Sequence, residues 1–373
     1  MKSNNLTGII FGYVHEDGLR ELTAKRMMAS VPFGCRYRVI DFTVSNMVNS
    51  GMNKIGVITN EKYHSLMNHL GSGKAFGLSR KHEGLSLLPP FGTEESTNTD
   101  GKKIEVLDSI SRFLHDSKDD YVLLADVDII ANMDYNDILD RHIESGADIT
   151  AVYRRDRVPA GRSNSIYSID VNDRIREVRV TRDMNAVANF AMGLYIMKRT
   201  LLLELVEDCM SHSAYDFDRD LIQKNVSLLR ILGYEYRDTA FILSSVEEYF
   251  KANMALTNVE VMRELIFKPN YPIYTKVRDD MPAKYGLGSS VSNCVVADGC
   301  VIDGEIENCV VSRSVKIGKG SVVRNCVIMR DTVIGENCRL DNVIVDKNVK
   351  ITDGKTLIGE TSYPVYIGKA KTV

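Results

Sequence analysis

Residues 5–60 read NLTGIIFGYVHEDGLRELTAKRMMASVPFGCRYRVIDFTVSNMVNSGMNKIGVITN, and this stretch decides the fold of the chain. An apolar run at Leu6–Phe11 leads into a polar loop, an amphipathic segment follows at Phe42–Ser50, and a second apolar run occupies Ile55–Thr59. The pattern predicts a strand, a loop, a helix and a strand, the opening βαβ unit of a parallel α/β sheet. In such sheets a ligand phosphate usually lies at the loop after the first strand, because backbone N–H groups and a helix N-terminus converge there.

The composition limits the class of protein. A chain of 373 residues with 44% apolar residues suits two domains with a large core. Its 47 basic and 50 acidic residues give a net charge of −3, which indicates neither nucleic acid nor an anionic membrane surface as a partner. No apolar run approaches the about 20 residues of a membrane span, and the N-terminus lacks the apolar core of a signal peptide. We therefore expect a soluble, cytoplasmic protein.

Residues 1–267 alternate strand-like and helix-like segments, which predicts a doubly wound, mostly parallel sheet with helices on both faces. The predicted strands are Ile9–Phe11, Ile55–Thr59, Leu85–Leu88, Tyr121–Ala125, Ile149–Tyr153, Ala191–Met197 and Ile231–Tyr236, and the predicted helices are Lys103–His115, Asn136–Ser145, Thr200–Met210 and Val246–Met254. Residues 268–283 contain three prolines and are expected to form an extended linker.

Residues 284–373 show a six-residue repeat in place of helical periodicity. Val322, Ile328, Ile334 and Leu340 are spaced by six, and a second register lies one position earlier. This is the hexapeptide signature of a left-handed parallel β-helix, in which three hexads build each triangular coil. Five of the seven cysteines lie here without a close pair, so we expect them to pack in the core rather than bind metal. A solenoid cannot bury its ends alone, so this domain is expected to dock on the first domain or on another subunit.

The segment Val31–Gly51, VPFGCRYRVIDFTVSNMVNSG, resembles the N-terminal signature of the bacterial ADP-glucose pyrophosphorylases, or glucose-1-phosphate adenylyltransferases. The resemblance extends over essentially the whole chain and implies a nucleotidyltransferase-like domain followed by the β-helix. Active members of that family carry a Gly-Gly-x-Gly-x-Arg phosphate loop just before this signature. The matching positions Tyr13–Gly18 read YVHEDG, so only Gly18 remains. Glu16 and Asp17 place negative charge where phosphates would lie, which opposes phosphate binding.

Two further family motifs are altered. The Arg-Ala-Lys-Pro tetrapeptide reads Arg26–Ala29, RMMA, which keeps the arginine and replaces the lysine by a methionine suited to core packing. The family's first metal-binding aspartate falls on Asp128, but aligning the next helix puts Ile242 on the second one. Asp238 is the alternative candidate for this second metal-binding aspartate, displaced from the family position. Magnesium prefers oxygen ligands, so one carboxylate opposite an isoleucine is a poor site.

The sugar and nucleotide motifs are altered as well. Val180–Thr181 replace the Glu-Lys of the sugar-phosphate site, Ala191–Gly193 replace a Ser-Met-Gly strand, and Asn98–Lys102 replace a Gly-Thr-Ala-Asp-Ala loop. Arg179 and Arg182 are close to Val180–Thr181 in the sequence. They either compensate for the missing lysine of the sugar-phosphate site or belong to a solvated strand edge. Because the family's sites are degraded together, the pattern indicates loss of catalysis.

A basic cluster survives beside Gly34. It consists of Lys25, Arg26, Arg36 and Arg38. In the family such groups at the junction with the β-helix bind anionic effectors, so the resemblance implies an effector site for a phosphorylated sugar or a nucleotide. The alternative is a set of salt bridges to Asp41 and to acids of the interface.

The pattern resembles the GlgD-type subunits of this family, which are partners of GlgC-type catalytic subunits in glycogen biosynthesis. The hypothesis is a non-catalytic or weakly catalytic regulatory subunit that forms a hetero-tetramer. Its vestigial catalytic candidates are Arg26 and Asp128, and Mg²⁺ is expected only if the chain is active. The alternative is an active adenylyltransferase that uses Asp128 as a metal ligand. A β-helix acyltransferase is disfavoured, because residues 284–373 contain no histidine.

Overall fold

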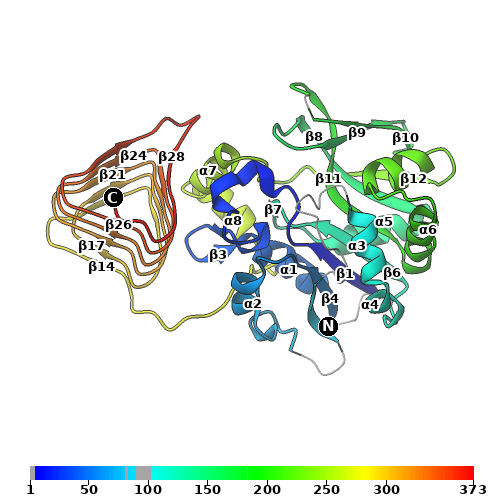
Figure 1. Cartoon of the computed structure of the whole chain (residues 1–373), viewed down its shortest axis with the longest axis horizontal. Helices are drawn as coiled ribbons and strands as arrows, with labels where there is room; N and C mark the ends of the chain where they lie inside the picture. The colour runs from blue at the N-terminus through cyan, green and yellow to red at the C-terminus, as the bar shows by residue number, and fades with distance from the viewer. Residues whose placement is uncertain (1–4, 80–82, 90–101, 183) are drawn as a thin grey trace.

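The computed structural model describes residues 5–79, 83–89, 102–182 and 184–373. It consists of an α/β domain and a β-helix that lie side by side (Figure 1). Residues 266–283 contain no helix or strand, and they run as an extended connection between the two domains. Within the described residues no helix is long and apolar enough to cross a membrane.

A 9-stranded mixed sheet forms the centre of the α/β domain. Its strands are β1 (Leu6–Phe11), β4 (Lys54–Ile58), β5 (Gly84–Leu88), β6 (Tyr121–Asp126), β8 (Ile149–Arg157), β9 (Asn164–Ile169), β10 (Ile175–Thr181), β11 (Val187–Lys198) and β12 (Ile231–Glu235). The parallel strands run in the order β5-β4-β1-β6, and β11 pairs antiparallel with β6, β8 and β9. The predicted α/β fold is confirmed, and the β9–β10 hairpin extends it beyond the predicted strands.

The helices follow the predicted alternation with one exception. They are α1 (Val39–Asn49), α2 (His64–Leu70), α3 (Lys103–Ser109), α4 (Ser111–His115), α5 (Tyr135–Ser145), α6 (Arg199–Ser211), α7 (Val246–Ala255) and α8 (Val259–Leu265), with 3₁₀ turns η1 (Glu16–Leu22), η2 (Met28–Ser30) and η3 (Lys74–Phe76) and the π-helical η4 (Phe217–Gln223). The single helix predicted over Lys103–His115 is wrong. Ile110 has φ −102° and ψ 10°, outside the helical region, so α3 and α4 are separate.

The first βαβ unit owes its geometry to burial and to a cap. All six residues of β1 are buried, as a central parallel strand requires. A Cβ atom on Gly8 would lie 2.4 Å from Met47 Sδ, so this glycine allows α1 to pack closely on β1. The Arg38 backbone N–H donates to the Asp41 carboxylate at 2.9 Å, which begins α1 with a capping interaction. Close packing of α1 on β1 and the cap at the start of α1 therefore fix the first βαβ unit.

The C-terminal domain is the predicted left-handed β-helix, made of three 5-stranded parallel stacks. The first stack is β14 (Lys284–Tyr285), β17 (Val301–Ile302), β20 (Lys316–Ile317), β23 (Val333–Ile334) and β26 (Lys350–Ile351); the second is β15 (Ser290–Ser292), β18 (Glu305–Glu307), β21 (Val322–Arg324), β24 (Arg339–Asp341) and β27 (Thr356–Ile358); the third is β16 (Val295–Val296), β19 (Val310–Val311), β22 (Val327–Ile328), β25 (Val343–Val345) and β28 (Val365–Ile367).

The coils are shorter than three full hexads. Val301 lies opposite Lys316 and Lys316 lies opposite Val333, so successive coils hold 15 and 17 residues. One corner is turned by asparagines at positive φ, among them Asn308 and Asn325, which leave only short connections between stacks. The expected packing of the cysteines is confirmed, since all seven are free and only Cys294 of those in this domain is not buried.

The β-helix docks on the α/β domain, as expected for a solenoid. Val327, Met329 and Ile344 belong to the same buried cluster as the core of the α/β domain, and α7 packs against β22. The Arg26 guanidinium contacts the Asp346 carboxylate at 2.6 Å inside this interface, and both side chains are buried. The Tyr366 hydroxyl donates to the same carboxylate at 2.7 Å. The two domains therefore share one core and one buried ion pair.

Candidate functional site

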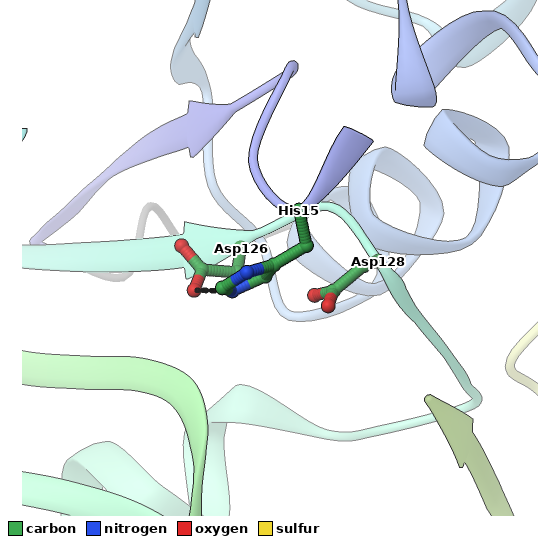
Figure 2. Close-up of side chains that lie close together, drawn as sticks. All are labelled: His15, Asp126 and Asp128. Carbon is green, nitrogen blue, oxygen red and sulfur yellow. Dashed lines mark ion pairs between the residues drawn. The ribbon is translucent and has the colours of Figure 1, made fainter. Parts of the chain in front are cut away.

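The carboxyl ends of β1 and β6 mark the place where an α/β sheet of this order binds its ligand. His15 lies in the loop after β1, Asp126 is the last residue of β6, and Asp128 follows it. Figure 2 shows the three side chains converging from these two loops. Their ligand atoms all lie within 4.8 Å of one another. We call this group the switch-point site.

Asp126 is already paired with a buried lysine. The Lys103 ammonium donates to both oxygens of the Asp126 carboxylate, at 2.7 and 2.8 Å, and His15 Nε2 lies 3.7 Å from one of them. Burial opposes the charge on Asp126, but Lys103 and His15 outweigh it and hold the pKa of that carboxyl below its usual range. A Cβ atom on Gly193 would lie 2.2 Å from the same carboxylate, so glycine is required there.

Asp128 is paired with a buried arginine. One oxygen of its carboxylate accepts a hydrogen bond from the Arg162 guanidinium, and Arg162 also donates to Asn164 Oδ1 at 3.1 Å. The other oxygen, Asp128 Oδ1, has no hydrogen-bond partner within the described residues. Ile242 lies next to this position, since it pairs with Ile129 between β13 (Ala240–Ile242) and β7 (Ile129–Ala131). The structure thus leaves one carboxylate oxygen without a partner beside an apolar neighbour.

The loop after β1 contains a carboxylate, Glu16, that is bound by groups of the same chain. Glu16 Oε1 accepts a hydrogen bond from the Met28 backbone N–H at 3.0 Å, and Glu16 Oε2 lies 3.1 Å from the Lys62 ammonium. Asp17 is exposed. A donor pair made of a backbone N–H and a lysine is suited to an anion, and here Glu16 takes that place. This agrees with the expected loss of the phosphate loop.

Among the described positions of the expected sugar and nucleotide motifs, Gly193 lies against the Asp126 carboxylate, and the Ala191 carbonyl accepts a hydrogen bond from the Arg162 guanidinium at 3.5 Å. Arg179 and Arg182 are exposed, and an Arg179 guanidinium nitrogen lies 3.8 Å from Met184 Sδ on the β10 edge. The carboxylate of Asp238 lies 3.8 Å from the Lys268 ammonium in a different cavity, away from Asp128. Asn98–Gly101 of the expected nucleotide loop lie outside the described residues.

The switch-point site is a poor fit for Mg²⁺. Its donor set is one imidazole and two carboxylates, whereas Mg²⁺ prefers octahedral oxygen coordination. A metal ion would have to displace Lys103 from Asp126 and Arg162 from Asp128, and separating these two buried ion pairs costs free energy. The open Asp128 Oδ1 alone does not offset that cost.

We therefore expect the chain to show no saturable binding of Mn²⁺, used as a spectroscopic substitute for Mg²⁺, at millimolar metal. Electron paramagnetic resonance of free Mn²⁺ in a titration measures this directly. The matched control is the double variant Lys103→Ala/Arg162→Ala, which uncovers both carboxylates and is expected to bind. Binding of one Mn²⁺ by the unmodified chain, lost on Asp128→Asn, would contradict the expectation.

A second site lies where the β-helix meets the α/β domain. It is a cavity of about 530 Å³ between α2, the linker and the β-helix. Its lining includes nine cations, namely Lys25, Arg36, Arg38, Lys276, Arg278, Arg313, Arg330, Lys347 and Lys369. His64 and His69 also line it, and no acidic side chain does among the described residues. We call it the junction cavity.

The junction cavity holds more positive charge than its neighbours neutralise. Asp298 lies 3.7 Å from Arg36 and 3.9 Å from Arg313, and Asp331 lies 3.5 Å from Arg330. Burial and the surrounding arginines lower the pKa of Arg38 to about 10. Burial, followed by Arg38, Arg26 and Arg330, lowers the pKa of Lys347 to about 6. An anion that binds among such groups stabilises their charged forms and so opposes the lowering of their pKa values.

The structure divides the predicted basic cluster. Lys25, Arg36 and Arg38 line the junction cavity. Arg26 does not line it; its guanidinium is paired with the Asp346 carboxylate. Arg26 is also not one of the three residues that meet at the switch-point site. The Arg38 guanidinium donates to the Ser65 carbonyl at 2.7 Å rather than to Asp41. Arg26 is thus placed as an interface residue.

Sequence reasoning missed the part of the junction cavity that the β-helix contributes. Arg313, Arg330 and Lys347 are spaced by 17 residues, which is the length of one coil. They stack on successive coils, since Asp331 N–H donates to the Arg313 carbonyl and Asn348 N–H to the Arg330 carbonyl, each at 3.1 Å. The signal in the sequence is a basic residue that recurs every 17 residues, and a search for charged residues at the length of one coil would have found it. Lys103 and Arg162 carry no comparable signal.

Comparison with known proteins agrees with this geometry. The family model described as nucleotidyl transferase matches residues 17–240, and one described as GlmU-like, C-terminal hexapeptide, matches residues 281–363. The glycogen biosynthesis protein GlgD of Bacillus subtilis is 34% identical over 369 residues, 99% of this chain and 97% of that relative. The glucose-1-phosphate adenylyltransferase of Thermosipho africanus is 33% identical over 322 residues, 86% of this chain and 78% of that relative. The chain therefore belongs to the nucleotidyl transferase family that contains the glucose-1-phosphate adenylyltransferases and GlgD.

Proposed function

We propose that this chain is a non-catalytic or weakly catalytic regulatory subunit of glucose-1-phosphate adenylyltransferase in glycogen biosynthesis. The reaction of that enzyme joins ATP and glucose 1-phosphate to ADP-glucose and diphosphate. The observation that carries the proposal is the pair of internal contacts Lys103–Asp126 and Arg162–Asp128. The second contact occupies Asp128, the position of the family's first metal-binding aspartate, and the first occupies the neighbouring carboxylate of Asp126.

The chemistry explains why these contacts matter. Nucleotidyl transfer depends on positioning the triphosphate and on neutralising the charge that develops on it, mainly with a divalent metal and fixed donors. In this chain Glu16 of the altered phosphate loop binds the Met28 backbone N–H and the Lys62 ammonium, and Ile242 stands where the second metal ligand is expected. Binding a triphosphate here would bring it against the Glu16 carboxylate, which costs free energy through like-charge repulsion.

In this proposal the chain regulates its catalytic partner by binding an anionic effector in the junction cavity. Its lining comes from both domains, so an anion bound there contacts the α/β domain and the β-helix at once. A ligand with one or two phosphate groups, such as a phosphorylated sugar or a nucleotide, has the charge that nine cations select. Lys25, Arg36 and Arg38 are the proposed contacts from the α/β domain.

The proposal includes a partner and a compartment. A subunit without its own metal site acts by changing the activity of a catalytic one, so we propose a GlgC-type partner in a hetero-tetramer. All seven cysteines are free, which is typical of a reducing compartment, and the proposed compartment is the cytoplasm.

The second candidate function is an active adenylyltransferase, favoured by the convergence of His15, Asp126 and Asp128 and by the unpartnered Asp128 Oδ1. It requires that ATP and metal binding displace Arg162. It predicts a measurable rate for the chain alone, and that Asp128→Asn abolishes this rate.

An adenylyltransferase assay separates the two functions. Diphosphate release is measured with Mg²⁺, ATP and glucose 1-phosphate for this chain alone, for a GlgC-type subunit alone and for the two mixed. The expected result is no turnover above background for the chain alone and a rate for the mixture that exceeds that of the partner.

The control for assembly is size-exclusion chromatography of the same mixture. If the chain joins the partner without changing its rate at any concentration of a phosphorylated effector, the regulatory function is wrong. If the chain alone turns over and Asp128→Asn stops it, the second function replaces the first.

A further inference from the structure

The first coil of the β-helix is open on the side that faces away from the second coil. Among the strands of the described residues, β14, β15 and β16 pair only with β17, β18 and β19. The second coil accepts the backbone N–H groups of alternate residues of the first, namely Lys284, Gly286, Ser290, Val295 and Ala297. Backbone groups alternate between the two edges of a strand, so those of Tyr285, Val291 and Val296 point to the open side. We call this side the open end.

The apolar core of the β-helix reaches the open end. Tyr285 and Val291 continue the inward-facing rows that contain Ile302 and Ile306 in the second coil. Ile302 and Ile306 are 0% and 1% exposed, whereas Tyr285 and Val291 are 50% and 38% exposed. Leu287, in the corner between β14 and β15, is fully exposed. Apolar side chains that gather in this way gain free energy when protein covers them.

The first coil is also depleted of charge. Residues 284–297 read KYGLGSSVSNCVVA, and Lys284 is the single charged residue among them. The next coil, residues 298–313, contains the charged residues Asp298, Asp303, Glu305, Glu307 and Arg313. A terminal coil that faces water is normally polar, and charged residues or prolines normally protect exposed strand edges. Depletion of charge is instead typical of the centre of a protein interface.

The shape of the open end selects the partner that covers it. Its three strand edges belong to the three sides of one coil, so a partner has to present three matching edges at once, which another β-helix coil does. The opposite end of this β-helix does not match. There Thr372 pairs with Lys350 of β26, and the Val373 carbonyl accepts a hydrogen bond from the Thr352 N–H at 2.9 Å, which covers one of the three edges. The matching surface is therefore the first coil of a second copy.

We propose that the first coils of two copies of this chain stack end to end about a twofold axis, and that Tyr285, Leu287 and Val291 of each copy are buried in the contact. A twofold axis across the coils reverses the direction of the facing strands, so they pair antiparallel and reciprocally. Such a contact closes after two copies and forms no filament. The proposal is independent of the regulatory function, and in a hetero-tetramer it places two copies of this chain next to each other.

The test is sedimentation velocity of the full chain, without partner subunit or effector, over a wide range of protein concentration. The expected result is a reversible dimer. Leu287→Glu should weaken it about tenfold or more, and because Leu287 is fully exposed in the single copy, the change leaves the fold of each copy intact. Val291→Glu places a charge at the uncovered core and should weaken the dimer at least as much. The matched control is Ile358→Glu, which changes a 57% exposed apolar residue of β27 in the last coil and should leave the dimer unchanged.

Hydrogen exchange locates the contact. The backbone amides of Tyr285, Val291 and Val296 should exchange more slowly in the dimer than in the Leu287→Glu variant. A chain that stays monomeric overturns the proposal, as does a dimer that neither substitution at the open end weakens or that Ile358→Glu weakens equally. A chain that is monomeric alone and assembles only with a GlgC-type subunit assigns the open end to that subunit, which also overturns a contact between two copies. Because no substrate is present, this result is separate from that of the adenylyltransferase assay.

Discussion

Asp346→Ala is expected to lower the free energy of unfolding by about 3–5 kcal/mol, because it leaves the Arg26 guanidinium buried and unpaired between the two domains. Arg26 and Asp346 are 4% and 1% exposed, so water cannot replace the lost carboxylate. The Tyr366 hydroxyl loses its acceptor in the same variant. Urea denaturation followed by circular dichroism and tyrosine fluorescence measures the loss, since the chain contains no tryptophan to dominate the emission.

A double variant distinguishes the unpaired charge from a general effect of truncation. Arg26→Met/Asp346→Leu replaces the ion pair by apolar side chains and is expected to recover most of the stability. Glu360→Ala removes an exposed carboxylate from the last β-helix coil and should stay within about 0.5 kcal/mol of the unmodified chain. If Asp346→Ala is no worse than Glu360→Ala, the ion pair does not hold the domains together.

The framework of the fold could be predicted because it depends on local patterns. The apolar runs that became β1, β4 and β6 and the repeat that became the β-helix depend on side-chain periodicity, which is visible in the sequence. Coil length could not be predicted from the hexads alone, because asparagine corners at positive φ shorten the connections. The break at Ile110 was missed because the apolar spacing continues across it.

The switch-point site could be predicted only in part. Asp128 and the changed phosphate loop are visible in the sequence, because they occupy positions of a contiguous motif. Lys103 and Arg162 are 23 and 34 residues from the carboxylates they contact. Those contacts depend on how α3 and the β8–β9 connection pack against the sheet, which no local pattern specifies. The contact of Arg26 with Asp346 could not be predicted for a similar reason, since its partner lies 320 residues away on the other domain.

Sulfate is expected to bind the junction cavity about tenfold more tightly at pH 6.5 than at pH 8.5, through proton uptake by Lys347. Sulfate keeps its charge over this range, so only the protein titrates. Lys347 is 8% exposed, and Arg38, Arg26 and Arg330 face it, while the Asp346 carboxylate is turned to Arg26. With a pKa of about 6 in the free protein, its amine is mostly neutral at pH 8.5. An anion raises that pKa, so binding and protonation favour each other, and the affinity falls as the pH rises above about 6.

Two variants assign this effect to Lys347 rather than to His69, which lines the same cavity and whose pKa is lowered by burial. Lys347→Met should bind sulfate weakly with little pH dependence between pH 7.5 and 8.5. Lys347→Arg stays charged and should bind well at both pH values. Calorimetry in two buffers of different ionisation enthalpy counts the protons taken up. Sulfate binding that is equally strong at both pH values in the unmodified chain would show that Lys347 is already charged.

The same residue links binding to stability. In the unfolded chain a lysine keeps a pKa near 10.4, so between that value and about 6 the unfolded state binds one proton more than the folded state. The contribution of Lys347 to folding therefore becomes less favourable as the pH falls across this window. Lys347→Met removes that penalty and should raise the melting temperature without sulfate at pH 7.5, while sulfate should stabilise the unmodified chain more than the variant. A cavity whose cations cost stability when empty is poised for an anion, and this trade-off is what an effector site requires and a purely structural salt-bridge network does not.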